Sequence, residues 1–284
     1  MKLLTFKWLG TERFGFLSED EKTVFAVRSD SKNTPQSLME FIELGSNSPD
    51  LLQQKASLDE LDKEGLELLP PICPKAIFCI GLNYSDHAKE MGKEKTEYPT
   101  VFFRLPRNHV AHGEIIVAPK LSDTLDWEAE LVVIIGKGGR YISSGEALDH
   151  VFGYSIYNEG SVRDYQHHTS QFGLGKCFQG SGAFGPVIVT ADEFGNPYGQ
   201  SIETRIDGEV VQSGPISNML HTIEDVIEYI SSTTELMPGD IICTGTPAGV
   251  GAGMKPQRFL KDGEQVDIHI SGIGTLSNAV KNEA

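Results

Sequence analysis

The sequence predicts an α+β, strand-dominated fold, with a small N-terminal α+β domain at residues 1–70 and a larger, mainly β domain at residues 71–284. Short apolar or alternating runs, which are typical of strands, outnumber helical patterns. The two do not alternate in the regular way of a doubly wound sheet. Pro70, Pro71 and Pro74 cannot lie inside a helix or a central strand, so they mark the boundary between the two parts.

The N-terminal domain is expected to contain two strands and one helix. Residues 2–8 and 23–28 have the composition of strands, and the polar run between them, 18–22, indicates a turn. The stretch from Thr34 to Gly45 predicts a short helix that ends at the glycine.

The larger domain is expected to be built mainly from strands. Residues 76–82 and 240–246 are apolar runs, and the tail alternates between apolar and polar residues. Asp207 and Gly208 separate two alternating runs and predict a hairpin with a type I′ turn. One amphipathic helix is expected over residues 221–232. Its apolar stripe consists of Ile223, Val226, Ile227 and Ile230.

The charge balance argues against nucleic acid and membrane partners. The 284 residues include 24 Lys and Arg against 40 Asp and Glu, a formal net charge of −16. Such an excess repels polyanions and anionic lipid. No run approaches the roughly 18 apolar residues of a membrane-spanning helix. Lys7 interrupts the N-terminal apolar stretch, which is too short for a signal peptide, so we expect a cytoplasmic protein.

The cysteines are expected to be buried free thiols. Each lies in or beside an apolar run, and none forms a C-x-x-C pair. This pattern is typical of a reducing compartment and predicts no cysteine-based zinc site. The four are Cys73, Cys79, Cys177 and Cys243.

Three carboxylates precede a buried run. Asp126, Glu128 and Glu130 occupy alternate positions, which share one face of a strand. Taken alone, the pattern is typical of a solvated edge strand. However, residues 131–135 predict a strand buried on both faces, where clustered carboxylates repel one another and lose hydration. A cation with oxygen ligands resolves both problems, which points to Mg²⁺, Mn²⁺ or Ca²⁺. Asp126, at the strand start, is expected to cap the strand or face solvent.

A second motif joins an imidazole to a carboxylate. Residues 79–92 predict a strand that ends at Gly81 and a short helix capped by Ser85 or Asp86. His87 and Glu90 lie three apart, on one surface of this helix. A carboxylate beside an imidazole orients it and suits a general base acting on water. The alternative is an ordinary exposed ion pair.

A third motif, residues 157–166, combines opposite charges after an apolar run. Glu159 is a candidate third carboxylate for the cation. Arg163 and Gln166 suit the carboxylate of a substrate. The alternative is a loop with a local pair between Glu159 and Arg163.

Two glycine-rich segments complete the candidates. Lys176 lies between glycines and apolar residues, where a lysine either snorkels to solvent or meets a bound anion. Residues 243–251 lack the spacing of a phosphate loop, but their backbone N–H groups are suited to an anionic oxygen. A simple tight turn is the alternative. The remaining histidines of interest are expected to be loop residues: His109, His112, His167 and His168.

In this order, six stretches together resemble the fumarylacetoacetate hydrolase family, over about Pro74 to the C-terminus. The resemblance implies a mixed β-roll catalytic domain, a homodimer and one divalent cation. Many members of the family also carry a small extra N-terminal domain. The stretches are GLNYSDHAKE (81–90), PTVFFRLP (99–106), DWEAELVVIIG (126–136), GYSIYNEGSVRDYQ (153–166), GKCF (175–178) and TGTPAGVG (244–251).

The resemblance also implies roles for individual residues. The metal ligands are Glu128, Glu130 and Glu159, the last at a position where the family commonly has Asp. The catalytic residues are His87 and Glu90, which activate water, and Lys176. Arg104, where the family often has Lys, and Arg107, where it has Ser, put the substrate in question. The substrate-binding residues are Arg104, Arg163, Gln166, Gly245 and Thr246.

The predicted function is a Mg²⁺-dependent hydrolase that cleaves a C–C bond in a 1,3-dicarbonyl acid, such as an acylpyruvate or fumarylpyruvate, through a metal-bound enolate. Such an activity belongs to aromatic catabolism. An alternative on the same site is an oxaloacetate decarboxylase or tautomerase, or a hydroxymuconate-type isomerase. A non-catalytic metal-binding module is disfavoured, because it needs no His87–Glu90 pair. The expected ligand is a small oxo acid or dicarboxylate.

Overall fold

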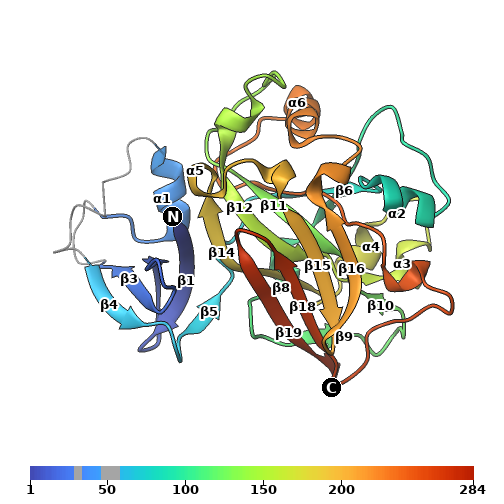
Figure 1. The fold of residues 1–284 in the computed structure, drawn as a ribbon, viewed down its shortest axis with the longest axis horizontal. Helices are drawn as coiled ribbons and strands as arrows, with labels where there is room; N and C mark the ends of the chain where they lie inside the picture. Colours follow the sequence, from blue (N-terminus) through green and yellow to red (C-terminus); the bar gives the residue numbers. More distant parts are fainter. Residues whose placement is uncertain (29–33, 46–57) are drawn as a thin grey trace.

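The computed structural model describes residues 1–28, 34–45 and 58–284. Two sheets dominate the molecule and a few short helices surround them, so the predicted α+β, strand-dominated class is confirmed (Figure 1). Both sheets are mixed, because single parallel pairs such as β17 with β6 and β19 with β9 interrupt antiparallel pairing.

The larger sheet contains twelve of the described strands, and its main path is β4-β3-β2-β1-β14-β12-β11-β17-β6-β7. β5 pairs with β1 and β8 pairs with β14 beside this path. The strands are β1 (Lys2–Trp8), β2 (Thr11–Leu17), β3 (Thr23–Val27), β4 (Leu58–Asp62), β5 (Glu67–Leu69), β6 (Ile77–Gly81), β7 (Thr100–Arg104), β8 (His109–Val110), β11 (Ala129–Ile135), β12 (Val151–Asn158), β14 (Gly182–Thr190) and β17 (Ile241–Cys243).

The second sheet contains five strands in the order β16-β15-β18-β19-β9, and a small ladder joins β10 to β13. The predicted type I′ turn is confirmed between β15 and β16, where Asp207 and Gly208 both have positive φ. The strands are β9 (Ile116–Ala118), β10 (Leu125–Asp126), β13 (Ser161–Val162), β15 (Ser201–Ile206), β16 (Glu209–Pro215), β18 (Gln265–Ile270) and β19 (Gly274–Asn282).

The helices are short, with one exception. α6 begins at a capping box between Thr222 and Asp225, and it buries the predicted isoleucine and valine stripe. α2, α3 and α4 gather on the side of the molecule away from the N-terminal strands (Figure 1). The helices are α1 (Leu38–Leu44), α2 (Ser85–Glu90), α3 (Arg163–Gln166), α4 (Gly173–Lys176), α5 (Ala191–Phe194) and α6 (Ile223–Thr233).

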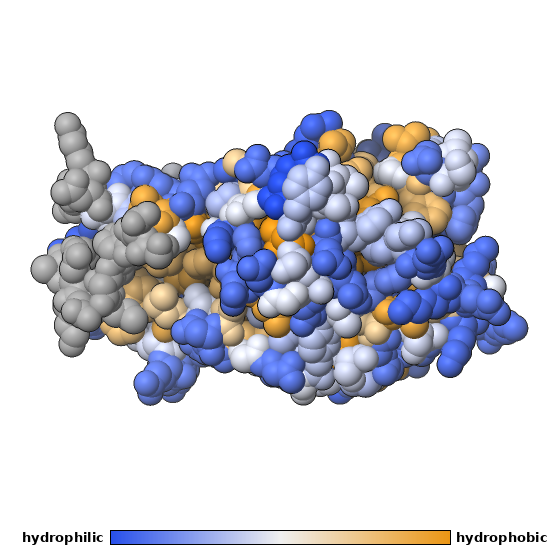
Figure 2. Space-filling model, turned by 90° about the horizontal axis from the view of Figure 1, so that it is seen from above, coloured by the Kyte–Doolittle hydropathy of each residue, from blue (hydrophilic) through white to orange (hydrophobic). Residues whose placement is uncertain are grey.

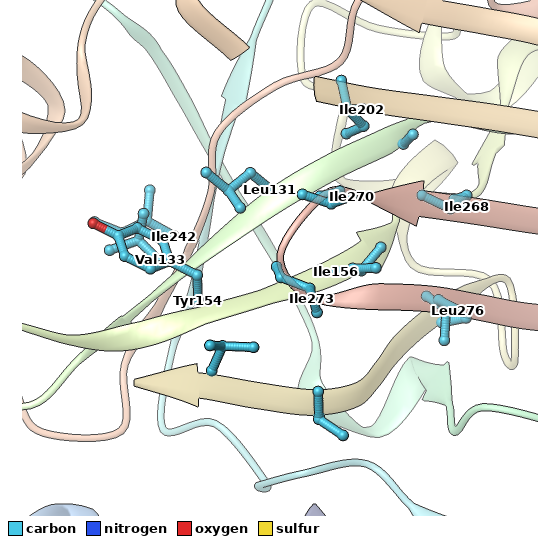
Figure 3. Packing of buried hydrophobic residues seen from close by; sticks show 14 of the residues in the cluster. Leu131, Val133, Tyr154, Ile156, Ile202, Ile242, Ile268, Ile270, Ile273 and Leu276 are labelled. Carbon is cyan, nitrogen blue, oxygen red and sulfur yellow. The ribbon is translucent and has the colours of Figure 1, made fainter. Parts of the chain in front are cut away.

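The main core lies between the two sheets. β11 is buried along its whole length, as predicted, because alternate residues face the second sheet and a separate apolar cluster behind the large sheet. Each aliphatic side chain buried in this way contributes roughly 1.5–3 kcal/mol. Figure 3 shows side chains of β11 and β12 beside those of the second sheet, among them Leu131, Ile156, Ile202, Ile268, Ile270 and Leu276.

The N-terminal strands extend the large sheet and do not form a sheet of their own, since Lys2 and Leu3 pair with β14. The sequence predicted two strands here and missed three, β2, β4 and β5; β2 pairs with β1 along its length. The expected helix starts later than Thr34, at Leu38, because the side chain of Ser37 caps it. A separate domain at residues 1–70 stays a prediction.

The surface is mainly polar, as the face in Figure 2 shows. Among the described helices, none has the length and apolar character needed to cross a membrane. All four cysteines are free, but the prediction that all are buried is wrong, because Cys73 is exposed and Cys177 is half-buried. Cys79 and Cys243 are buried side by side where β6 pairs with β17.

Candidate active site

α2 holds the predicted imidazole–carboxylate pair. Nδ1 of His87 lies 3.1 Å from Oε2 of Glu90. A carboxylate only accepts hydrogen bonds, so Nδ1 carries the proton in this pair and Nε2 is the basic nitrogen. The expected cap by Ser85 or Asp86 is wrong, since the residue before the helix is Tyr84 and its side chain makes no capping bond.

The glycine-rich segment after β17 fixes the carboxylate of this pair. Oε1 of Glu90 accepts a hydrogen bond of 3.0 Å from the backbone N of Gly249. Gly253 lies so close that a Cβ there would stand 2.3 Å from Cδ of Glu90. Both carboxylate oxygens are therefore held, which fixes the orientation of the His87 ring.

The three alternating carboxylates do not lie on one strand. Asp126 ends β10, which pairs with β13, and Glu130 is in β11, while Glu128 lies in the gap between the two strands. The prediction that Asp126 faces solvent or caps the strand is wrong, because its side chain is fully buried. It accepts hydrogen bonds from Gly251 N at 2.7 Å and from Nε of Arg163 at 2.7 Å.

Glu128, Glu130 and Glu159 form a buried cluster in which one ligand oxygen from each lies within 4.8 Å of the others. A backbone hydrogen bond of 2.8 Å from Glu159 N to Glu128 O joins the loop after β12 to the start of β11. Because the two segments are tied at the ligands themselves, these side chains converge although they are far apart in the sequence.

Burial and neighbouring charges shift the pKa values of the three carboxyl groups in the cluster. Burial opposes the charge of Glu128, but Arg163 and Lys176 hold the pKa of its carboxyl below the ordinary value. Burial and the neighbouring Glu159 carboxylate raise the pKa of Glu130. Burial also raises the pKa of Glu159, against the pull of Lys176. Like charges are thus crowded in a place from which water is excluded.

A divalent cation fits these residues. Oε1 of Glu159 is buried and has no hydrogen-bond partner among the described residues. The donor set consists of carboxylate oxygens only, which suits a hard cation such as Mg²⁺. Binding would relieve the repulsion that raises the pKa of Glu130. The family that the sequence resembles commonly has Asp at position 159. The longer side chain of Glu159 still reaches the other two carboxylates.

Lys176 spans two of the candidate ligands. Its Nζ lies 2.8 Å from Oε2 of Glu159 and 2.5 Å from Oε2 of Glu128. Burial opposes the ammonium charge, but these two carboxylates raise the pKa of Lys176. An ammonium group has three donors, so one remains for a substrate oxygen. The snorkelling alternative is wrong, because the side chain is buried.

Arg163, at the start of α3, links three polar groups. Its Nε contacts Asp126, and its Nη1 lies 2.6 Å from Oε1 of Glu128 and 3.0 Å from Oε1 of Gln166. Its Nη2 is buried without a hydrogen-bond partner among the described residues. The local Glu159–Arg163 pair considered from the sequence is not formed. The two N–H groups of Nη2 are thus left for a ligand in the cavity that Arg163 lines.

Arg104 does not line the cavity where the sequence placed it. It is buried behind the carboxylates, where Nη1 donates to Gly160 O at 2.9 Å and lies 3.9 Å from Oε1 of Glu159. Its guanidinium also lies over the Tyr157 ring. At this position Arg104 places a positive charge beside Glu159, and it does not line the cavity in which the sequence analysis expected it to contact a substrate.

Gly245 and Thr246, the two predicted substrate-binding residues of the loop after β17, differ in whether a polar group is available to a substrate. The backbone N of Gly245 donates to Oε2 of Glu130 at 3.0 Å, so it is not free for a substrate oxygen as expected. Thr246 does reach the cavity, and its Oγ1 accepts from Nε2 of Gln212 at 2.8 Å. The loop positions one candidate ligand and exposes one hydroxyl.

A cavity of about 210 Å³ unites these side chains. It is smaller than the roughly 300–1,000 Å³ of sites for drug-sized ligands, which favours a small substrate. Of the histidines expected in loops, His109 lies in β8, whereas His167 lies in the turn after α3, as expected, and lines the cavity. The predicted residues that line it are His87, Glu128, Glu130, Glu159, Arg163, Gln166, Lys176 and Thr246.

Several lining residues escaped the sequence analysis. Lys93 lies only three residues after α2, and this closeness in the sequence to His87 and Glu90 could have identified it as a residue of the site. The apolar wall has no such signal, because aromatic and aliphatic residues of this kind are typical of any core. It consists of Ile80, Leu82, Met91, Phe102 and Phe172.

The model of the fumarylacetoacetate (FAA) hydrolase C-terminal domain matches residues 76–281. The chain belongs to the fumarylacetoacetate hydrolase family. The resemblance carried by the six sequence stretches is confirmed by this match, which begins shortly after Pro74.

Two relatives in this family are named for the same activity. Oxaloacetate tautomerase YisK of Bacillus subtilis (strain 168) is 39% identical over 300 residues, which cover 99% of this chain and 100% of YisK. The mitochondrial oxaloacetate tautomerase FAHD2A of Homo sapiens is 36% identical over 251 residues, covering 87% and 80%.

Solved structures agree over the whole chain. A fumarylacetoacetate hydrolase from psychrophilic Exiguobacterium antarcticum superposes with a TM-score of 0.88 at 38% identity, covering 100% of both chains. A 5-carboxymethyl-2-hydroxymuconate delta-isomerase from Mycobacterium smegmatis superposes with a TM-score of 0.81 at 26% identity, again covering both chains fully. The N-terminal strands are therefore shared with these neighbours.

Proposed function

We propose that this protein is an oxaloacetate tautomerase, which interconverts the enol and keto forms of a four-carbon 2-oxo diacid. The observation that carries the proposal is that His87, oriented by Glu90, lines the same small cavity as Glu128, Glu130 and Glu159. The activity for which the relatives in Bacillus subtilis and Homo sapiens are named supports the same reaction. The alternative weighed in the sequence analysis thus replaces the hydrolase as the first candidate.

The proton at C3 is assigned to His87. In the enol-to-keto direction, Nε2 in its protonated form donates a proton to C3, and the 2-hydroxyl oxygen releases its proton to water. In the reverse direction neutral Nε2 takes the proton from C3. Glu90 accepts from Nδ1 throughout, which stabilises the imidazolium and keeps Nε2 directed as the reacting nitrogen.

Other residues hold the 2-oxo acid end. The remaining N–H of Lys176 stabilises negative charge on the 2-oxygen, and Nη2 of Arg163 with the side-chain amide of Gln166 binds the adjacent carboxylate. The apolar wall excludes water and strengthens these contacts. This arrangement needs no nucleophile from the chain.

Glu128, Glu130 and Glu159 would hold a divalent cation, for which Mg²⁺ is our first choice and Mn²⁺ or Ca²⁺ are alternatives. When bound, such a cation supplies Lewis-acid polarisation of the 2-oxo group. Arg104 supports the site from behind by keeping a positive charge near Glu159.

The test follows the decay of enol-oxaloacetate by ultraviolet absorbance in the presence of Mg²⁺. Wild-type protein should accelerate the decay, and Glu90→Gln should lower kcat about 10- to 100-fold, because the orienting carboxylate is lost. Pyruvate release, measured in parallel, separates tautomerisation from decarboxylation. Release of pyruvate at the rate of enol decay would contradict tautomerisation as the principal activity.

Hydrolysis of a C–C bond remains a second candidate, favoured by the name of the solved Exiguobacterium antarcticum structure. In that reaction the His87–Glu90 pair activates a water molecule, and Lys176 stabilises the carbanion that leaves. An acylpyruvate assay decides between the two. Turnover of an acylpyruvate with a kcat/KM above that of enol-oxaloacetate would favour the hydrolase.

We also propose that the protein is a cytoplasmic homodimer. β7 is an edge strand of the large sheet, and Phe103 on it is 60% exposed. Leu174 in α4, which contacts β7, is 75% exposed. Unpaired edges with apolar side chains favour association. Sedimentation equilibrium should give twice the mass of the chain, and Phe103→Ser should lower it towards the monomer.

A further inference from the structure

The buried charges around the candidate metal cluster nearly cancel without a substrate. Four carboxylates, Asp126 with the three candidate ligands, meet three cations, which leaves one negative charge. A divalent cation would turn this into one positive charge. One substrate carboxylate neutralises it, so the second carboxylate of a diacid needs a further cation. The three buried cations are Arg104, Arg163 and Lys176.

Each buried cation already has a carboxylate neighbour. Arg163 contacts Asp126 and Glu128, and Lys176 lies between Glu128 and Glu159. Lys93 differs, because it lines the cavity and forms no ion pair with any residue in the described ranges 1–28, 34–45 and 58–284. It is also exposed, so Lys93 lines the part of the cavity that is open to solvent.

Backbone hydrogen bonds hold Lys93 against α2, the helix that carries His87 and Glu90. Gly92 adopts a positive φ of 66°, and its N donates to Lys89 O at 3.0 Å. The N of Lys93 then donates to Ala88 O at 2.8 Å. These two bonds close the helix end and direct the chain back over the turn that carries His87. Lys93 and the base therefore belong to one local unit.

We propose that Lys93 binds the distal carboxylate of the substrate and so selects a 2-oxo diacid over a 2-oxo monoacid. The inference rests on the proposed function and deepens it by naming the residue that reads the second carboxylate. A diacid held at both ends places its C3 between the carboxylate cluster and His87. The apolar wall lets a monoacid enter but offers it no replacement for this ion pair.

The experiment compares oxaloacetate with 2-oxobutyrate, which has the same chain length and a methyl group in place of the distal carboxylate. Dissociation constants are measured by calorimetry on Mg²⁺-loaded protein, and KM is measured for enol-oxaloacetate. The variants are Lys93→Met, Lys93→Arg and the control Lys89→Met. Lys89 lies in α2, four residues before Lys93, and carries the same charge but does not line the cavity.

Lys93→Met should raise the Kd and KM for oxaloacetate about tenfold and leave the Kd of 2-oxobutyrate unchanged, since one charge-assisted bond is lost. Lys93→Arg should restore the affinity to within about threefold, and Lys89→Met should change it less than twofold. Equal effects of Lys93→Met on both acids, or no effect on either, would overturn the proposal.

The outcomes also separate this inference from the proposed function. If wild type converts enol-oxaloacetate and Lys93→Met leaves its KM unchanged, the role of Lys93 is wrong and the tautomerase stands. If wild type binds oxaloacetate through Lys93 but does not accelerate enol decay, the role of Lys93 stands and the reaction is wrong.

Discussion

The carboxylate of Asp126 lies 2.7 Å from Nε of Arg163, in a place that no solvent reaches. The same carboxylate accepts from the backbone N of Gly251 and Ala252, so one side chain connects Arg163 to the glycine-rich segment that also holds Glu90. Asp126 therefore holds Arg163 and the segment at Gly251 in place, although it is not one of the three candidate metal ligands.

Replacing Asp126 with Asn should destabilise the fold by about 3–5 kcal/mol, because Arg163 then lacks part of its buried counter-charge. The free energy of unfolding in urea measures the effect. Asp123→Asn, at an exposed position in the same segment, is the matched control and should change stability by about 0.5 kcal/mol or less. Equal unfolding curves for the two variants would contradict a stabilising role of the buried contact between Asp126 and Arg163.

A methyl group at Gly253 should disturb the base without removing it. Gly253→Ala places a Cβ 2.3 Å from Cδ of Glu90, so the carboxylate must move away from His87. We expect kcat for enol-oxaloacetate to fall about tenfold with little change in KM, since the binding groups are elsewhere. Gly199→Ala, where nothing lies within 4 Å of the new Cβ, should keep wild-type kcat.

Binding of Mg²⁺ should raise the melting temperature through the carboxylate cluster. At a hundredfold excess over Kd, a bound ligand stabilises the fold by about 2.7 kcal/mol. Glu130→Gln removes one charge from the cluster and should abolish most of this rise, whereas Asp123→Asn should keep it. A rise of the same size in the Glu130 variant would place the cation elsewhere.

His109 should make stability depend on pH. Burial and the Arg104 guanidinium lower the pKa of His109 from 6.5 to about 4. The unfolded chain therefore binds a proton first as the pH falls, so the stabilisation is complete above about pH 6.5 and is lost towards pH 4. The loss is as much as about 3 kcal/mol relative to His109→Gln. Parallel unfolding free energies of the two proteins between pH 7 and 4.5 would contradict this.

The sequence predicted the parts of the site that depend on short spacing. His87 and Glu90 needed only one helical turn, and the buried run after Glu130 identified a central strand. Glu159 was already a candidate third carboxylate from its position after an apolar run, and the resemblance to the family then implied the same role. These features are local, or they are repeated across a family of sequences.

Features that depend on long-range packing were missed. The break between β10 and β11 buries Asp126 against Gly251, which is 125 residues away, and no local pattern shows this. Arg104 was expected to contact the substrate because the resemblance to the family implies a basic substrate-binding residue at this position. Its actual partners, Gly160 and Ser181, come from other parts of the chain.

If His87 transfers a proton at C3 of a 2-oxo diacid, hydrogen exchange at that carbon depends on His87. Wild-type protein and His87→Gln are incubated with oxaloacetate and Mg²⁺ in D₂O, and exchange at C3 is followed by proton NMR. We expect wild type to accelerate exchange above the background and His87→Gln to lose about 10²–10⁴ of this rate while still binding Mg²⁺. Exchange at the wild-type rate in His87→Gln would contradict this role of His87.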